Sequence, residues 1–267
     1  MSDTVMLVGC GNMGRAMLKG WLKNSSDISA LVVEPDADLR EAAAALGAQV
    51  FAKVSAVPAS VMPDLVFLAV KPQVMASVLP DYAHYDTTFV SVAAGVTVDT
   101  LRQGLGGAAP VIRCMPNTPA AIGQGMMVCY GTEEVSDRAR GLTDRLLATS
   151  GEVAWIDEEN LMDAVTAVSG SGPAYVFHLI ECLGAAGEAA GLPADLSAQL
   201  ALQTVMGAGK LAAMGETPPG TLREQVTSPG GTTAAALSVM MEGGRFQTMM
   251  TEAVEAARAR GEELGAA

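Results

Sequence analysis

The sequence predicts an α/β fold in two parts, a doubly wound parallel sheet followed by an all-helical domain. Three observations lead to this prediction. Short β-branched runs alternate with helical segments in the first part of the chain, which is typical of a parallel sheet. A glycine-rich turn directly follows the first of these runs. From residue 158 onward the strand pattern disappears, and stretches rich in Ala, Leu, Gly and Met replace it. We therefore expect a sheet domain over residues 1–157 and a helical domain over residues 158–267.

The elements of the first domain are expected in alternating order. The strands are expected at residues 5–8, 30–34, 65–70, 88–92, 111–115, 126–129 and 153–156. The helices are expected at residues 13–22, 38–46 and 137–148.

The second domain should consist of helices alone. They are expected at residues 159–168, 174–190, 194–214, 232–241 and 246–264. Several are apolar nearly all round, which indicates burial on more than one side. A unit of about 110 residues has difficulty enclosing such helices alone. We therefore expect this to be a dimerisation domain, in a homodimer or a larger homo-oligomer.

Composition excludes several classes of function. A net charge of −13 disfavours nucleic acid and anionic membrane surfaces as partners. The longest apolar stretch contains His178, Glu181 and Glu188, so no membrane span is expected. No basic segment precedes the first strand, which predicts a cytoplasmic protein without a secretory signal. The four cysteines show no metal-ligand spacing, and the two histidines form no visible pair with Cys or Asp, so no metal site is expected.

The glycine-rich turn predicts a site for a nicotinamide dinucleotide. Its sequence is Gly9-Cys10-Gly11-Asn12-Met13-Gly14, between the first strand and the first helix. In this Rossmann-like context Gly9 permits the tight turn, Gly11 lets the backbone approach the pyrophosphate and Gly14 allows close packing of helix and strand. The helix N-terminus then offers free N–H groups to the phosphates.

Three further segments are expected at the same edge of the sheet. Lys71 directly follows a central strand, where residues lie in the ligand crevice of this architecture; the alternative is a solvated loop lysine. Ala93-Ala94-Gly95 follows the next strand and would leave room for a flat cofactor. Glu34 stands 20 residues after Gly14, where a carboxylate normally binds the adenosine ribose hydroxyls of NAD. We therefore expect NADH to be used at least as well as NADPH.

Four motifs, together with the glycine loop, resemble the pyrroline-5-carboxylate reductase family along essentially the whole chain. They are Val70-Lys71-Pro72-Gln73, Arg113-Cys114-Met115-Pro116-Asn117-Thr118-Pro119, Ser169-Gly170-Ser171-Gly172-Pro173-Ala174-Tyr175 and Ser228-Pro229-Gly230-Gly231-Thr232-Thr233. The resemblance implies reduction of a cyclic imine, pyrroline-5-carboxylate, to proline, mostly with NADPH. It also implies a homodimer with a shared active site, often assembled into decamers.

The resemblance further implies the residues of the site. Those around the cofactor would be Gly9, Cys10, Gly11, Asn12, Met13, Gly14, Ala69, Val70, Lys71, Pro72, Ala93, Ala94, Gly95 and Asn117. Those that hold the substrate carboxylate would be Ser228, Gly231, Thr232 and Thr233, with Glu216 near the same pocket. The hydroxyl of Thr233 would reach the ring nitrogen, which makes Thr233 the expected catalytic residue.

The residues around the last motif independently support the binding of the substrate carboxylate there. Pro229-Gly230-Gly231 precedes an expected helix, so several amide N–H groups lack intrahelical partners and could bind a small carboxylate. The alternative, that Ser228 or Thr232 is an ordinary N-cap, stays open from sequence.

Two other functions compete with imine reduction. One is a dehydrogenase of small hydroxy acids, which would need a base; Lys210 is the only lysine after residue 71 and thus the one candidate. The other is a non-catalytic dinucleotide sensor that uses the helical domain as an interaction surface.

Overall fold

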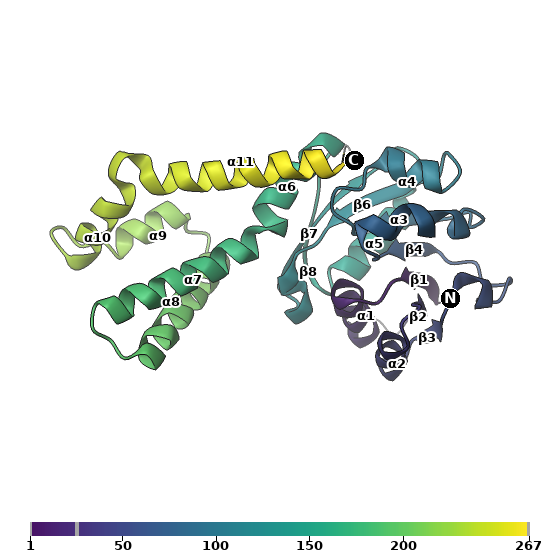
Figure 1. The fold of residues 1–267 in the computed structure, drawn as a ribbon, viewed down its shortest axis with the longest axis horizontal. Coiled ribbons are helices and arrows are strands. Elements are labelled where there is room, and N and C mark those ends of the chain that lie inside the picture. The colour runs from purple at the N-terminus through teal and green to yellow at the C-terminus, as the bar shows by residue number, and fades with distance from the viewer. Residues whose placement is uncertain (1, 25–26, 266–267) are drawn as a thin grey trace. The chain divides into compact units, whose positions relative to one another are not determined.

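The structure, a computed structural model, describes residues 2–24 and 27–265 (Figure 1). The chain divides into two compact units. One contains the residues up to Ser171 together with the segment from Ala257 onward, and the other contains Gly172–Ala256. The expected boundary after residue 157 lies just beyond the last strand of the sheet and inside the first unit. The assignment of cofactor binding to residues 1–157 and of dimerisation and substrate binding to residues 158–267 stays a prediction.

The first unit is built on one sheet with the strand order β3-β2-β1-β4-β5-β6-β7-β8. Its strands are β1 (Asp3–Val8), β2 (Ile28–Val33), β3 (Gln49–Phe51), β4 (Leu65–Leu68), β5 (Thr88–Ser91), β6 (Val111–Met115), β7 (Gly125–Gly131) and β8 (Gly151–Trp155). All neighbouring pairs are parallel except β6 and β7, which are antiparallel. The prediction of a doubly wound, mainly parallel sheet is confirmed.

Both faces of this sheet are covered, as the alternation along β1 shows. Val5 and Leu7 belong to one buried cluster, which includes Trp21 of α1 (Asn12–Asn24) and Leu146 of α5 (Asp137–Leu147). Met6 and Val8 belong to a second cluster. That cluster includes Met75 of α3 (Pro72–Val78) and Leu101 of α4 (Val98–Gly104). Successive side chains of a strand point to opposite faces, so each face acquires its own core.

Three short elements of this unit were not expected from sequence. The strand β3 has only three residues, too few for a recognisable alternation. The helix α3 begins at Pro72, which suits a first helical position because it has no N–H to leave unpaired. The helix α4 is seven residues long, with Thr97 as its N-cap. By contrast, the expected helix at residues 38–46 appears as α2 (Ala37–Ala45), capped by Asp36.

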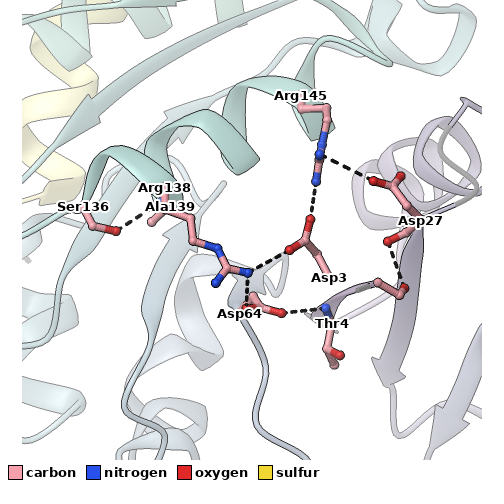
Figure 2. A network of polar contacts seen from close by, with 9 residues as sticks. Asp3, Thr4, Asp27, Asp64, Ser136, Arg138, Ala139 and Arg145 are labelled. Atoms are coloured by element: carbon pink, nitrogen blue, oxygen red, sulfur yellow. Dashed lines mark hydrogen bonds and ion pairs between the residues drawn. The ribbon is translucent and has the colours of Figure 1, made fainter.

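A polar network ties α5 to the amino edge of the sheet (Figure 2). Arg138 donates to the carboxylates of Asp3 and Asp64 at 2.9 and 2.8 Å, and Arg145 also pairs with Asp3. Asp64 accepts a further bond from the backbone N–H of Thr4 at 2.8 Å. The network therefore fixes the end of the sheet opposite to the carboxyl edge.

The helix expected at residues 159–168 is instead three short pieces. A 3₁₀ turn spans Glu159–Leu161, α6 spans Met162–Val165, and a π-helical turn spans Thr166–Gly170. The expectation of one regular helix was wrong here, because apolar spacing does not distinguish an α-helix from a π-helical turn.

The second unit is helical, as predicted. Its helices are α7 (Gly172–Ala189), α8 (Ala194–Met214), α9 (Pro219–Gln225), α10 (Thr232–Met241) and the first part of α11 (Arg245–Gly265). The helices α7 and α8 form an antiparallel hairpin (Figure 1), in which the Ser197 hydroxyl donates to the Gly184 carbonyl at 2.6 Å. A Cβ at Gly187 would lie 2.1 Å from the Ser197 oxygen, so glycine permits this close approach.

Many apolar side chains of this unit are exposed in the single chain. Phe177 is 58% exposed, Leu202 56%, Met206 51% and Val239 60%. Exposed apolar side chains that gather on one unit in this way are typical of protein–protein contacts. The helices of the described part of the chain are not long and apolar enough to cross a membrane.

Candidate active site

A cavity of about 500 Å³ opens at the carboxyl ends of β1, β2 and β4. Of the predicted cofactor residues, it brings together Gly9, Gly11, Glu34, Ala69, Val70 and Lys71. Another cavity, of about 440 Å³, lies at the opposite edge of the sheet, and no predicted site residue lines it. The carboxyl edge is where open α/β sheets bind ligands, so the first cavity is the candidate site.

The three glycines of the loop differ in what surrounds them. A Cβ at Gly9, whose φ is +86°, would lie 2.9 Å from the Ala69 carbonyl oxygen. A Cβ at Gly14 would lie 2.5 Å from the Gly9 carbonyl oxygen, so both positions need glycine for the chain to pack. A Cβ at Gly11 would meet nothing within 4 Å, although Gly11 lines the cavity. The open space at Gly11 fits the pyrophosphate of a dinucleotide.

Glu34 lies directly after β2 and is only 6% exposed. Its carboxylate accepts hydrogen bonds from the backbone N–H groups of Cys10, at 2.7 Å, and Asp36, at 3.0 Å. Arg40 reaches back from α2, but it donates to the backbone carbonyls of Glu34, at 2.8 Å, and Pro35. The buried carboxylate therefore remains on the cavity wall, with its charge offset by two backbone donors.

Cys10 is a buried thiol behind the glycine loop. Burial, together with the negative charge of Glu34, raises the pKa of Cys10 to about 11. A thiol with a raised pKa is mostly protonated near neutral pH, which disfavours a nucleophilic role for Cys10.

The cavity is also lined by residues that were not predicted from the sequence to belong to the site. They are Val8, Val33, Pro35, Leu39, Ala52, Lys53, Val54, Val74, Ser77, Val78, Asp81 and Tyr82. Lys53 matters most among them because it brings a positive charge to the cavity wall. Its position just after β3 was the available signal, but β3 itself was not recognised.

The other predicted cofactor residues lie outside this cavity wall. Pro72 begins α3, Asn12 and Met13 form the first turn of α1, and Ala93 and Ala94 follow β5. Gly95 has a φ of +72°, and a Cβ on it would lie 3.3 Å from that of Leu264. The last turn of α11 thus packs against the loop that follows β5, a contact that the sequence did not predict.

Asn117 follows β6, at the same edge of the sheet. Its side chain donates to the Ser169 carbonyl at 3.1 Å and accepts from the Met126 N–H at 2.9 Å. Both ends of the amide are therefore engaged within the protein.

The predicted substrate loop lies in the second unit, between α9 and α10. Its turn places Gly230 at a φ of +70°, and the Gly231 N–H bonds to the Ser228 carbonyl at 3.0 Å. The N-cap of α10 is Gly231, and no side chain of the described residues caps it. The interpretation of Ser228 or Thr232 as a side-chain N-cap is therefore wrong. The first N–H groups of α10 remain available to an anion.

The remaining candidates are exposed in the second unit. Glu216 lies in the turn between α8 and α9, and Lys210 lies on α8. Across the described part of the chain, no group of His, Cys, Asp or Glu side chains is arranged to hold a metal ion.

Comparison with known proteins assigns both parts of the chain. Residues 159–264 match the family model for pyrroline-5-carboxylate reductase dimerisation, and residues 4–95 match the model for coenzyme F420-dependent NADP oxidoreductases. A curated pyrroline-5-carboxylate reductase of Pseudomonas aeruginosa is 38% identical over 264 residues, which is 97% of this chain and 96% of the relative.

Solved structures agree with these matches. A pyrroline-5-carboxylate reductase from Coxiella burnetii superimposes with a TM-score of 0.92 at 31% identity, covering 99% of each chain. The Plasmodium falciparum pyrroline carboxylate reductase with NADP bound gives a TM-score of 0.82 at 28% identity, covering 98% of each chain.

Proposed function

The chain belongs to the pyrroline-5-carboxylate reductase family, and on this premise we propose how its own residues serve the reaction. The protein reduces 1-pyrroline-5-carboxylate to L-proline with NAD(P)H, the last step of proline biosynthesis. When bound, the reduced nicotinamide supplies the hydride for the carbon of the C=N bond. Family membership decides against the hydroxy-acid dehydrogenase and the dinucleotide sensor.

The cavity at β1, β2 and β4 holds the adenosine and pyrophosphate of the cofactor. The open space at Gly11 receives the pyrophosphate, next to the N-terminus of α1. The Glu34 carboxylate faces the adenosine ribose and favours NADH, whose ribose carries two hydroxyls and no phosphate. The segments Ala69–Pro72 and Ala93–Gly95 continue the site along the carboxyl edge toward the nicotinamide.

The loop Ser228–Thr233 holds the substrate carboxylate. The observation that supports this best is the uncapped N-terminus of α10, where Gly231 precedes Thr232 and Thr233 and no side chain of the described residues supplies the acceptor. An anion there meets backbone N–H donors, a helix dipole and two hydroxyls without requiring arginine. Glu216 lies near the same pocket in this proposal.

The hydroxyl of Thr233 hydrogen-bonds the ring nitrogen of the imine. A polarised or protonated C=N bond has a more electrophilic carbon, so orientation and one hydrogen bond are sufficient help from the protein. The protein then needs no histidine as a strong acid, which agrees with the low histidine content of the chain, two residues in all. The final proton comes from solvent or from the iminium form of the substrate.

The active protein is a cytoplasmic homodimer, or a larger assembly such as a decamer, with the substrate loop of one subunit completing the cofactor site of the other. Residues 159–264 match a dimerisation domain. A second subunit would bury the exposed apolar side chains of α7, α8, α10 and α11. Neither nucleic acid nor a membrane surface is a partner, given the net charge of −13.

Mixed dimers test the shared site. Subunits with Gly11→Asp, which places a carboxylate in the pyrophosphate space, are co-expressed with Thr233→Val subunits under different affinity tags. If sites are shared, one site of each doubly purified dimer combines two intact halves, so activity returns to about half of the wild-type value. If each subunit works alone, mixed dimers are no more active than the mean of the two parent variants.

A further inference from the structure

The amide of Asn117 connects two segments that are distant in sequence. Its oxygen accepts from the N–H of Met126 at the start of β7, at 2.9 Å. Its nitrogen donates to the carbonyl of Ser169, at 3.1 Å, and lies 3.5 Å from the Ser169 hydroxyl. Asn117 itself is partly buried between these partners. Each end of the amide is thus engaged by the protein, which leaves one acceptor lone pair and one weakly engaged N–H.

The Ser169 carbonyl lies in the π-helical turn Thr166–Gly170, which is closed by the Ser171 N–H bonded to the Thr166 carbonyl at 2.8 Å. In a regular α-helix, the Ser169 carbonyl would accept from the N–H of residue 173. Residue 173 is a proline and has no N–H. Asn117 thus supplies a donor to this carbonyl in place of the α-helical one, which Pro173 lacks.

The turn is held at the carboxyl end of β6. A Cβ at Gly170 would lie 2.6 Å from the terminal methyl of Met115, the last residue of that strand. β6 runs parallel to β5, so its carboxyl end lies at the same edge as the dinucleotide cavity. With the adenosine at β1 and β2, the nicotinamide of a dinucleotide lies toward this other half of the sheet.

We propose that Asn117 is a positioning residue, which holds the Thr166–Gly170 turn beside the nicotinamide end of the site without binding the cofactor itself. This inference rests on the proposed function, because it assigns the turn to the hydride-transfer step. It also replaces the expectation, drawn from family resemblance, that Asn117 lines the cofactor. A displacement of the turn alters the alignment of the reacting atoms, to which hydride transfer is sensitive.

The test compares three variants in the full-length protein. Asn117→Asp keeps the acceptor for the Met126 N–H but turns a carboxylate oxygen toward the Ser169 carbonyl. Asn117→Ala removes both bonds without adding charge, which covers the case that Asn117→Asp fails to fold. Gln124→Glu is the matched control, because the side chain of Gln124 is an exposed amide between β6 and β7 whose one hydrogen bond to the described residues goes to the neighbouring Gly123 carbonyl.

Three quantities are measured for each variant. They are the Kd of the reduced cofactor from its fluorescence, the kcat for imine reduction at saturating cofactor, and amide hydrogen exchange of the peptide 166–173. For Asn117→Asp and Asn117→Ala we expect kcat to fall about 10- to 100-fold, faster exchange in the peptide, and a cofactor Kd within about twofold of wild type. Gln124→Glu should match wild type in all three.

A cofactor Kd raised about tenfold or more with kcat preserved would overturn the proposal, since Asn117 would then bind the cofactor directly. Unchanged kcat together with unchanged exchange would also overturn it. If the wild-type protein does not reduce the imine at all, the proposed function fails instead. The exchange measurement then still reports whether Asn117 holds the turn.

Discussion

The carboxylate of Glu34 accepts a hydrogen bond from the backbone N–H of Cys10, with 2.7 Å between oxygen and nitrogen. The residue that follows β2 thereby holds the second residue of the glycine loop that follows β1. Val8 and Val33 are paired in the sheet just before these residues. The hydrogen bond therefore connects the carboxyl ends of two neighbouring strands. A ligand that enters the cavity meets a carboxylate already oriented by backbone donors.

This orientation predicts that NADH is used at least as well as NADPH. A carboxylate about 5 Å from the 2′-phosphate of NADPH would cost about 3 kcal/mol per unit charge at an effective dielectric constant of about 20. Glu34→Ser should shift the ratio of kcat/KM values toward NADPH. It should also weaken binding of both cofactors, because the bond to Cys10 is lost. The measurement is kcat/KM with each cofactor at a fixed imine concentration.

Two further variants separate the charges around that site. Asp38→Ser removes an exposed carboxylate from the first turn of α2 and should leave the cofactor ratio unchanged. Lys53→Ala removes a positive charge from the cavity wall. It should lower kcat/KM with NADPH and leave kcat/KM with NADH unchanged. A wild-type preference for NADPH of tenfold or more would contradict the assignment of Glu34 to the ribose.

The loop glycines predict opposite effects for two similar substitutions. Gly11→Ala adds a methyl group that meets no protein atom within 4 Å, so the free energy of unfolding should change by less than about 1 kcal/mol. Cofactor affinity should nevertheless fall, because the methyl occupies the pyrophosphate space. Gly14→Ala forces a methyl to 2.5 Å from the Gly9 carbonyl oxygen and should lower the free energy of unfolding by about 1–3 kcal/mol. Urea unfolding and cofactor titration of each variant measure both effects. Wild-type cofactor affinity in Gly11→Ala would show that the pyrophosphate lies elsewhere.

Replacing Thr233 with Val tests the proposed bond to the imine nitrogen. The change keeps the shape of the side chain and removes its donor, which should lower kcat/KM by about 5- to 150-fold. Cofactor Kd should stay the same, because the hydroxyl is proposed to bind the imine nitrogen and not the dinucleotide. Thr221→Val on α9, an exposed position with no assigned role, is the control. Full activity in Thr233→Val would remove this residue from the mechanism.

The network at the amino edge predicts a pH-dependent contribution to stability. Burial raises the pKa of Asp3, but the hydrogen bonds and charges of Arg145 and Arg138 outweigh it and hold the pKa below its ordinary value (Figure 2). A carboxyl with a lowered folded-state pKa stabilises the fold above its unfolded pKa of about 3.9, and this contribution is lost as the pH falls through the folded value.

Asp3→Asn should therefore lower the free energy of unfolding by about 1 kcal/mol or less at pH 7, since the arginines are well exposed. The difference from wild type should shrink toward pH 3 and in high salt. Urea unfolding at fixed protein concentration measures it, with the exposed Asp157→Asn as control. An equal difference at both pH values would show that the charge of Asp3 is not responsible.

The sequence predicted the sheet and the glycine loop well because both depend on local patterns. Strand alternation and the spacing from Gly14 to Glu34 are readable in a short window, and the structure brings Gly9, Gly11 and Glu34 to one cavity. The three-residue β3 was too short to recognise, and with it Lys53 was missed.

Other features depend on contacts across long stretches of chain. The contact between Gly95 and Leu264 joins residues far apart in sequence. The bond between Asn117 and Ser169 depends on a π-helical turn, which apolar spacing does not show. Such pairings follow from tertiary packing rather than from the periodicity of one segment.

The most direct test of the account follows nicotinamide absorbance with 1-pyrroline-5-carboxylate as substrate and identifies the product by mass spectrometry and chiral chromatography. We predict that NADH or NADPH is oxidised only when the imine is present, and that L-proline forms in a one-to-one ratio with the oxidised cofactor. Cofactor binding without turnover of the imine, or turnover of small hydroxy acids in its place, would contradict the account.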